Sequence, residues 1–123
     1  MKKIVIDLDD TISKTIDSDY KNSQPIVEVI ELLQEYREKG FEIVISTSRN
    51  MRTFNANVGK INAVTLPIIV EWLQHHRVPF DEIHIGKPWC GTDGFYVDDK
   101  AIRPSEFLAN SYEEIIGILN QKK

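Results

Sequence analysis

The stretch KKIVIDLDDTI, residues 2–12, decides how this sequence folds. Its apolar run predicts a buried β-strand over residues 3–7, yet three carboxylates, Asp7, Asp9 and Asp10, fall within four positions at the end of that strand. Burying even one unpaired carboxylate costs several kcal/mol, or it raises the pKa of that carboxyl group. A strand that is aimed at the core and ends in three acids therefore indicates a site of charged chemistry.

The length of the chain predicts a single domain, residues 1–123, because this length supports one hydrophobic core but hardly two. The net charge of −4 argues against a broad surface for nucleic acid or anionic lipid. The lone Cys90 cannot form an internal disulfide, and the longest apolar stretch, residues 63–70, is too short to span a bilayer. With no signal peptide in the pattern, we expect a cytoplasmic protein with no membrane partner.

Strand-like and helix-like periods alternate along the chain, which predicts the α/β class with a mostly parallel sheet. Apolar residues recur at helical spacing after Gln24, and Gly40 is expected to end that helix. Pro67 indicates that the helix expected over residues 61–76 either starts near it or is kinked there. The other expected elements are strands over 41–46, 82–86 and 94–99 and a final helix in SYEEIIGIL, where Ser111 and Glu114 have capping-box spacing.

Ligands of open parallel sheets bind outside the carboxyl ends of the strands. Acids that converge there from two strands are tolerable around a hard cation such as Mg²⁺, which prefers oxygen ligands. A hydroxyl and a lysine beside the cation suit a phosphoryl group. The residues that follow the four expected strands are Asp7, Asp9 and Asp10, then Ser46, Thr47, Ser48 and Arg49, then Lys87, and finally Asp98 and Asp99.

These motifs carry a family resemblance. DLDDT, starting at Asp7, resembles the DxDx[TV] motif of the haloacid dehalogenase superfamily, and Thr47, Lys87 and Asp98-Asp99 resemble its second, third and fourth motifs, in the same order. ISTSRNMRT, HIGKPWCG and FYVDDKAIRPSEF resemble small phosphatases associated with bacterial capsular polysaccharide biosynthesis. The resemblance implies a Rossmann-like three-layer core without a substantial cap domain.

The resemblance also implies a mechanism. Asp7 would be the nucleophile that forms an aspartyl-phosphate, and Asp9 the general acid and base. Mg²⁺ would be held by the Asp7 carboxylate, the Asp9 main-chain carbonyl and Asp98. An acid at position 9 favours phosphoester hydrolysis, because superfamily ATPases usually carry threonine there and dehalogenases lack that acid.

Thr47 and Lys87 would bind phosphoryl oxygens, with Asp99 orienting Lys87. Ser46 or Ser48 could present the hydroxyl instead, and Thr47 is preferred because TSR resembles the TGR-like form of the second motif.

Asp10 departs from the glycine that often follows the second acid, and is interpreted as a turn or supporting residue. The polar loop after residue 47 is interpreted either as a plain solvated loop or as a substrate-recognition loop. Trp89 could stack on a sugar, yet core packing is at least as plausible for it. The candidates for substrate binding are Ser48, Arg49, Asn50, Arg52 and Trp89.

The sequence thus predicts a Mg²⁺-dependent phosphomonoesterase for a small metabolite, such as a sugar or polyol phosphate. A phosphatase for a macromolecular phosphoester, a nucleic-acid end or a phosphoprotein, is a second hypothesis. A phospho-receiver signalling domain is a third, disfavoured because Lys87 precedes Asp98-Asp99 and a further strand. With almost no insertion at the cap positions, the site is expected to be open, unless a second copy of the chain covers it.

Overall fold

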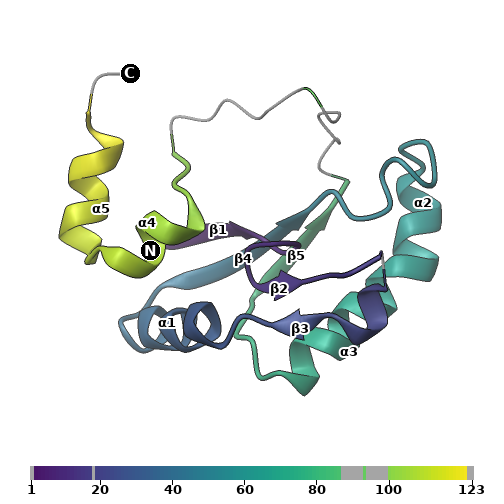
Figure 1. Ribbon diagram of the computed structural model, residues 1–123, viewed down its shortest axis with the longest axis horizontal. Coiled ribbons are helices and arrows are strands. Elements are labelled where there is room, and N and C mark those ends of the chain that lie inside the picture. Colours follow the sequence, from purple (N-terminus) through teal and green to yellow (C-terminus); the bar gives the residue numbers. More distant parts are fainter. Residues whose placement is uncertain (1, 18, 87–92, 94–99, 122–123) are drawn as a thin grey trace. The chain divides into compact units, whose positions relative to one another are not determined.

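A computed structural model describes residues 2–17, 19–86, 93 and 100–121 of the chain (Figure 1). It divides into two compact units, Met1–Trp89 and Cys90–Lys123, each of which is described by itself. None of the helices among the described residues is both long and apolar enough to cross a bilayer.

The first unit is built on a parallel sheet with the strand order β1-β4-β5. The strands are β1 (Lys3–Asp7), β4 (Glu42–Thr47) and β5 (Glu82–Ile85), close to the predicted ranges. Each connection between them is a crossover, and right-handed crossovers that proceed in one direction place both helices on one face of the sheet. The α/β class with a parallel sheet is therefore confirmed.

Two crossover helices, α1 (Val27–Glu38) and α3 (Leu66–His75), lie on the same side of this sheet (Figure 1). Gln34 of α1 donates a hydrogen bond to the carbonyl of Arg77, just after α3, at 2.9 Å. The fully buried side chains are mainly aliphatic and come from the sheet, both helices, the turn after β1 and the segment just before α3; they include Leu8, Ile12, Leu33, Ile43, Ile45, Ile61, Ile69 and Leu73.

The predicted helix ends are confirmed where local chemistry sets them. Gly40 follows α1 with φ +88°, the left-handed conformation that glycine adopts most easily. The helix predicted over 61–76 is instead a short α2 (Val58–Lys60), a π-helical turn η2 (Ile61–Thr65) and then α3, with Pro67 in its first turn. Proline is tolerated there because the first turn of a helix has amide groups without intrahelical acceptors.

The described insertion between β1 and α1 is a small hairpin, β2 (Ser13–Lys14) paired antiparallel with β3 (Gln24–Pro25), with the 3₁₀ turn η1 (Tyr20–Asn22) between them. The hydrophobic pattern of the sequence did not predict these short elements. Neither this hairpin nor the α2–η2 segment is large enough to be a separate cap domain.

The second unit contains α4 (Pro104–Ala109) and α5 (Tyr112–Leu119). The Ser111 hydroxyl accepts from the Glu114 amide at 3.2 Å, and the Glu114 carboxylate accepts from the Ser111 amide at 2.8 Å. The predicted capping box is confirmed. The strand expected over 94–99 lies outside the described residues, and the single-domain assignment stays a prediction.

Candidate active site

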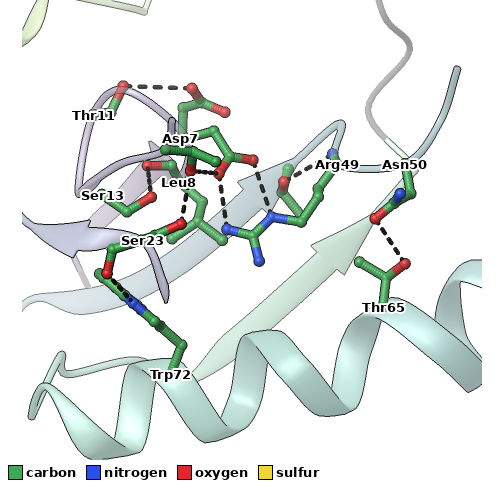
Figure 2. A network of polar contacts seen from close by, with 12 residues as sticks. Asp7, Leu8, Thr11, Ser13, Ser23, Arg49, Asn50, Thr65 and Trp72 are labelled. Atoms are coloured by element: carbon green, nitrogen blue, oxygen red, sulfur yellow. Dashed lines mark hydrogen bonds and ion pairs between the residues drawn. The ribbon is translucent and has the colours of Figure 1, made fainter. Parts of the chain in front are cut away.

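Asp7 and Thr47 end two neighbouring strands of the sheet. Asp7 is the last residue of β1 and pairs in register with Ser46, whereas Thr47 is the last residue of β4. Thr11 donates from its hydroxyl to Asp7 Oδ2 at 3.4 Å (Figure 2). The predicted nucleophile and the predicted phosphate-binding hydroxyl therefore lie at the same edge, where parallel sheets bind their ligands.

A tight turn after β1 presents Asp9. The amides of Ile12 and Ser13 both donate to the carbonyl of Leu8, at 2.9 and 3.1 Å, while the Leu8 and Ile12 side chains are fully buried. Asp10 is exposed and has φ +63°, which aspartate tolerates better than most residues. Asp10 thus lies in the turn, and the buried Leu8 and Ile12 anchor that turn on both sides of it.

Asp9 forms a two-pronged ion pair with Arg49, the second residue after β4. Arg49 donates from Nε to Asp9 Oδ2 at 3.1 Å and from Nη2 to Asp9 Oδ1 at 2.8 Å. The Arg49 side chain is 1% exposed and that of Asp9 is 25% exposed. The ring of Tyr20, from η1, lies 4.4 Å from the guanidinium carbon. The arginine is thus enclosed between a carboxylate and an aromatic face.

Thr47 is 1% exposed, and its hydroxyl accepts a hydrogen bond from the Arg49 amide at 3.0 Å. This bond closes a turn that starts the loop after β4 and brings Arg49 back toward β1. Ser46 and Ser48, the two alternatives for the hydroxyl, are both half-buried. Thr47 can still donate its own hydroxyl proton, because an oxygen that accepts one bond keeps its donor.

The other candidates for substrate binding in this loop differ in exposure. Asn50 has φ +63°, and its side-chain oxygen accepts from the Thr65 hydroxyl at 2.9 Å, which ties the loop to η2. Arg52 is exposed, and Ser48 is half-buried. Of the two predicted substrate-binding arginines, Arg52 therefore meets solvent, whereas Arg49 is turned inward onto Asp9.

A polar network that the sequence pattern did not predict connects Asp9 to the hairpin, and Figure 2 shows its bond between Ser23 and Trp72. The Thr15 hydroxyl contacts Asp9 Oδ1 at 3.4 Å and the Ser23 hydroxyl at 2.7 Å. Trp72 of α3 donates from Nε1 to the Ser23 carbonyl at 2.9 Å, and Ser23 is 5% exposed. The only feature of the sequence that indicated the contact between Arg49 and Asp9 was position: Arg49 follows one strand, and the acids follow the neighbouring strand.

The possible metal ligands among the described residues fit a magnesium ion. They are oxygens: the Asp7 carboxylate and the main-chain carbonyl of Asp9, which accepts no hydrogen bond within the described residues. Magnesium typically takes one or two carboxylates and completes its shell with water and phosphate. No group of three or more acidic, histidine or cysteine side chains that could hold a metal occurs in the described part of the chain. Four predicted residues, Lys87, Trp89, Asp98 and Asp99, lie outside it.

Comparison with known proteins defines the class. The family model of haloacid dehalogenase-like hydrolases matches residues 4–71, which contain both strand ends described above. The chain therefore belongs to the haloacid dehalogenase-like hydrolases. It is also similar to the crystal structure of a target protein from Vibrio cholerae, with 59% sequence identity, full coverage of both chains and a TM-score of 0.96. No curated protein matches the chain significantly.

Proposed function

We propose that this protein is a Mg²⁺-dependent phosphomonoesterase that works through an aspartyl-phosphate. One observation carries the proposal: β1 ends in Asp7, and the turn after it presents a second acid, Asp9, at the edge where Thr47 ends β4. A carboxylate nucleophile can form the enzyme-bound intermediate, a second acid can serve as general acid and base, and a hydroxyl can bind a phosphoryl oxygen.

The proposed reaction has two steps. An Asp7 oxygen attacks phosphorus, the bond to the leaving oxygen breaks, and Asp9 gives that oxygen a proton. Asp9 then takes a proton from a water molecule that attacks the phosphorus of the aspartyl-phosphate, which releases inorganic phosphate and restores Asp7. One pair of carboxylates thereby performs both nucleophilic and acid–base catalysis.

Thr47 and Lys87 are proposed to bind the phosphoryl oxygens, and Asp99 to orient Lys87. Magnesium would be held by the Asp7 carboxylate, the main-chain carbonyl of Asp9 and Asp98. Its contribution is to neutralise charge on the transferring phosphoryl group. Asp7, Asp9 and Asp98 would otherwise repel one another, so the cation also makes the acidic cluster tolerable.

The proposed substrate is a small phosphorylated metabolite, a sugar or polyol phosphate used in capsule or polysaccharide biosynthesis in the cytoplasm. The resemblance of the three motif segments to capsule-associated phosphatases supports this substrate class. The small β2–β3 hairpin is the described insertion after the first motif, which supports an open site. A second copy of the chain is proposed to cover it.

Hydrolysis of p-nitrophenyl phosphate by the purified protein tests the proposal. We expect activity with Mg²⁺, loss of that activity with a chelator, and recovery when Mg²⁺ is restored. Asp7→Asn should lower kcat at least ~1,000-fold, because it removes the nucleophile.

Asp17→Asn is the control for the same change of residue type outside the site, because Asp17 is exposed and asparagine tolerates its φ of +53°. It should keep wild-type activity. Full activity of Asp7→Asn would rule out the aspartyl-phosphate mechanism.

A further inference from the structure

The contacts of the Arg49 side chain support an inference that goes beyond this proposal. Its side chain is buried, and two of its three guanidinium nitrogens contact different oxygens of Asp9, at 3.1 and 2.8 Å. An arginine fork that contacts both oxygens sets the plane of a carboxylate as well as its position. Lysine cannot do this, because its ammonium group is a single point of charge.

The remaining nitrogen, Nη1, is buried and has no hydrogen-bond partner among the described residues. An unpaired buried donor lowers stability, so stability alone is a poor explanation for arginine at this position. Nε and Nη2 are already committed to the Asp9 carboxylate. What the geometry does achieve is to hold Asp9.

One acceptor position of the Asp9 carboxylate stays open in this arrangement. Oδ1 accepts from Arg49 Nη2 and lies 3.4 Å from the Thr15 hydroxyl, whereas Oδ2 accepts from Arg49 Nε alone among the described residues. Each carboxylate oxygen has two lone pairs. Oδ2 therefore keeps a lone pair that can carry a proton while the arginine fork is in place.

Tyr20 completes the arrangement from the other side. Its ring centroid lies 4.4 Å from the Arg49 guanidinium carbon, within the range of a cation–π interaction. Tyr20 belongs to η1, in the hairpin whose Ser23 is bonded to Trp72 of α3. The aromatic cover is thus attached to the core of the first unit.

We propose that Arg49 is the positioning residue of Asp9, that Tyr20 holds its guanidinium, and that Asp9 Oδ2 is the oxygen that exchanges the proton. This inference rests on the proposed function. In the first step the proton passes from Oδ2 to the leaving oxygen as the phosphorus–oxygen bond breaks. In the second step Oδ2 takes a proton from the attacking water. Arg49 contacts neither the substrate nor the nucleophile in these steps.

The choice of leaving group tests this role. A p-nitrophenolate ion leaves without help from an acid, whereas the alkoxide of an alkyl phosphate needs a proton. Misplacing Asp9 must therefore slow the first step only for the alkyl ester, but must slow hydrolysis of the aspartyl-phosphate for both substrates. Asp9→Asn, measured first, defines the pattern that loss of the acid and base produces.

We expect Arg49→Lys to show the same pattern in milder form. Rapid mixing with p-nitrophenyl phosphate should give a burst of about one nitrophenolate per active site, followed by slow turnover. For glycerol 1-phosphate, or another alkyl monoester that the wild type hydrolyses, kcat should fall ~10- to 100-fold with little change in KM. In the Asp9→Asn background, Arg49→Lys should have almost no further effect.

Two further comparisons separate positioning from a general loss of structure. Tyr20→Leu should produce a weaker burst phenotype, and Tyr20→Phe should restore wild-type kinetics because it keeps the ring. Arg37→Lys is the matched control outside the site: it makes the same change in another Arg–Asp pair of 2.8 Å, that with Asp81, and should leave the hydrolysis of both substrates unchanged. If an Arg49 variant does not fold, the Tyr20 pair decides the question.

Equal losses on both substrates without a burst, or a rise in KM alone, would overturn the inference. The second result would make Arg49 a substrate-binding residue, as its loop position first suggested. Failure of the proposed function has a different signature: the wild-type protein would hydrolyse neither ester, or Asp9→Asn would be fully active.

Discussion

Two Arg–Asp pairs in this protein have the same length and opposite surroundings. Arg49–Asp9 and Arg37–Asp81 each have an Nη2–oxygen distance of 2.8 Å. The Arg49 side chain is 1% exposed, and those of Arg37 and Asp81 are 40% and 37% exposed. Water weakens the attraction in the second pair, whereas the first has given up its hydration and depends on its partner. Distance alone therefore does not measure the contribution of either pair.

The pairs also differ in which member supports the fold. Asp81 accepts a second hydrogen bond, from the backbone amide of Ile43 at 2.8 Å, and Ile43 is fully buried in β4. In the Arg37–Asp81 pair the carboxylate binds the backbone of a strand, whereas the arginine lies at the surface. At the site the reverse holds, because the arginine is buried and Asp9 still meets solvent.

The largest expected effect is that of Arg49→Met on stability. It leaves Asp9 with a partly buried charge and no arginine, which should lower the free energy of unfolding by about 3 kcal/mol, the lower end of the range for broken buried pairs. Denaturant unfolding followed by circular dichroism measures it. A loss below about 1 kcal/mol would mean that burial does not distinguish the two pairs.

Asp81→Ala comes next, with an expected loss of about 1–3 kcal/mol, because it leaves the buried Ile43 amide without its acceptor. Asp81→Asn is the matched variant, since it removes the charge and keeps a side-chain oxygen that can accept from that amide. Asparagine should retain most of the stability that alanine loses. Equal losses for both variants would assign the effect to the ion pair instead.

Arg37→Met should cost less than about 1 kcal/mol, as expected for an exposed ion pair. Added salt should shrink even this difference between variant and wild type, because counter-ions screen exposed charges. Unfolding of both proteins at low and high ionic strength measures it. A large, salt-independent loss would contradict the contrast between the two environments.

The smallest effect concerns His76, which packs against the ring of Trp72 at 4.5 Å. Burial, and secondarily the neighbouring His75, lower the pKa of His76 below the ordinary value of 6.5. The unfolded chain then binds the proton more readily, so stability should fall as the pH drops from 6.5 through the lowered pKa. His76→Gln should reduce this slope in thermal unfolding, while leaving the difference between the two ion pairs unchanged.

Local pattern was enough to predict much of the fold. The apolar runs ending at Asp7 and Thr47 predicted β1 and β4, and Gly40 and Ser111 predicted helix ends, because strand burial and capping depend on neighbouring residues. The π-helical turn before Pro67 was not predictable in the same way. Where such a helix changes its period depends on packing against other elements.

The candidate site likewise has features that the sequence predicted and features that it did not. Its acids and hydroxyl were predicted because each follows a strand, and parallel strands bring their carboxyl ends to one edge. Arg49 was predicted to contact substrate, and its burial against Asp9 and Tyr20 became evident only in three dimensions. Nothing within a few residues of Arg49 in the sequence distinguishes it from the exposed Arg52.

The sequence by itself determined that the strand in KKIVIDLDDTI ends in an acidic cluster, and that neighbouring strands bring a hydroxyl to the same edge. Only the tertiary structure decided what holds Asp9 in place. The guanidinium comes from a position 40 residues further along the chain, and the hairpin that covers it is fixed through Trp72. Such contacts depend on the relative positions of whole elements, which are set by packing and not by local preference.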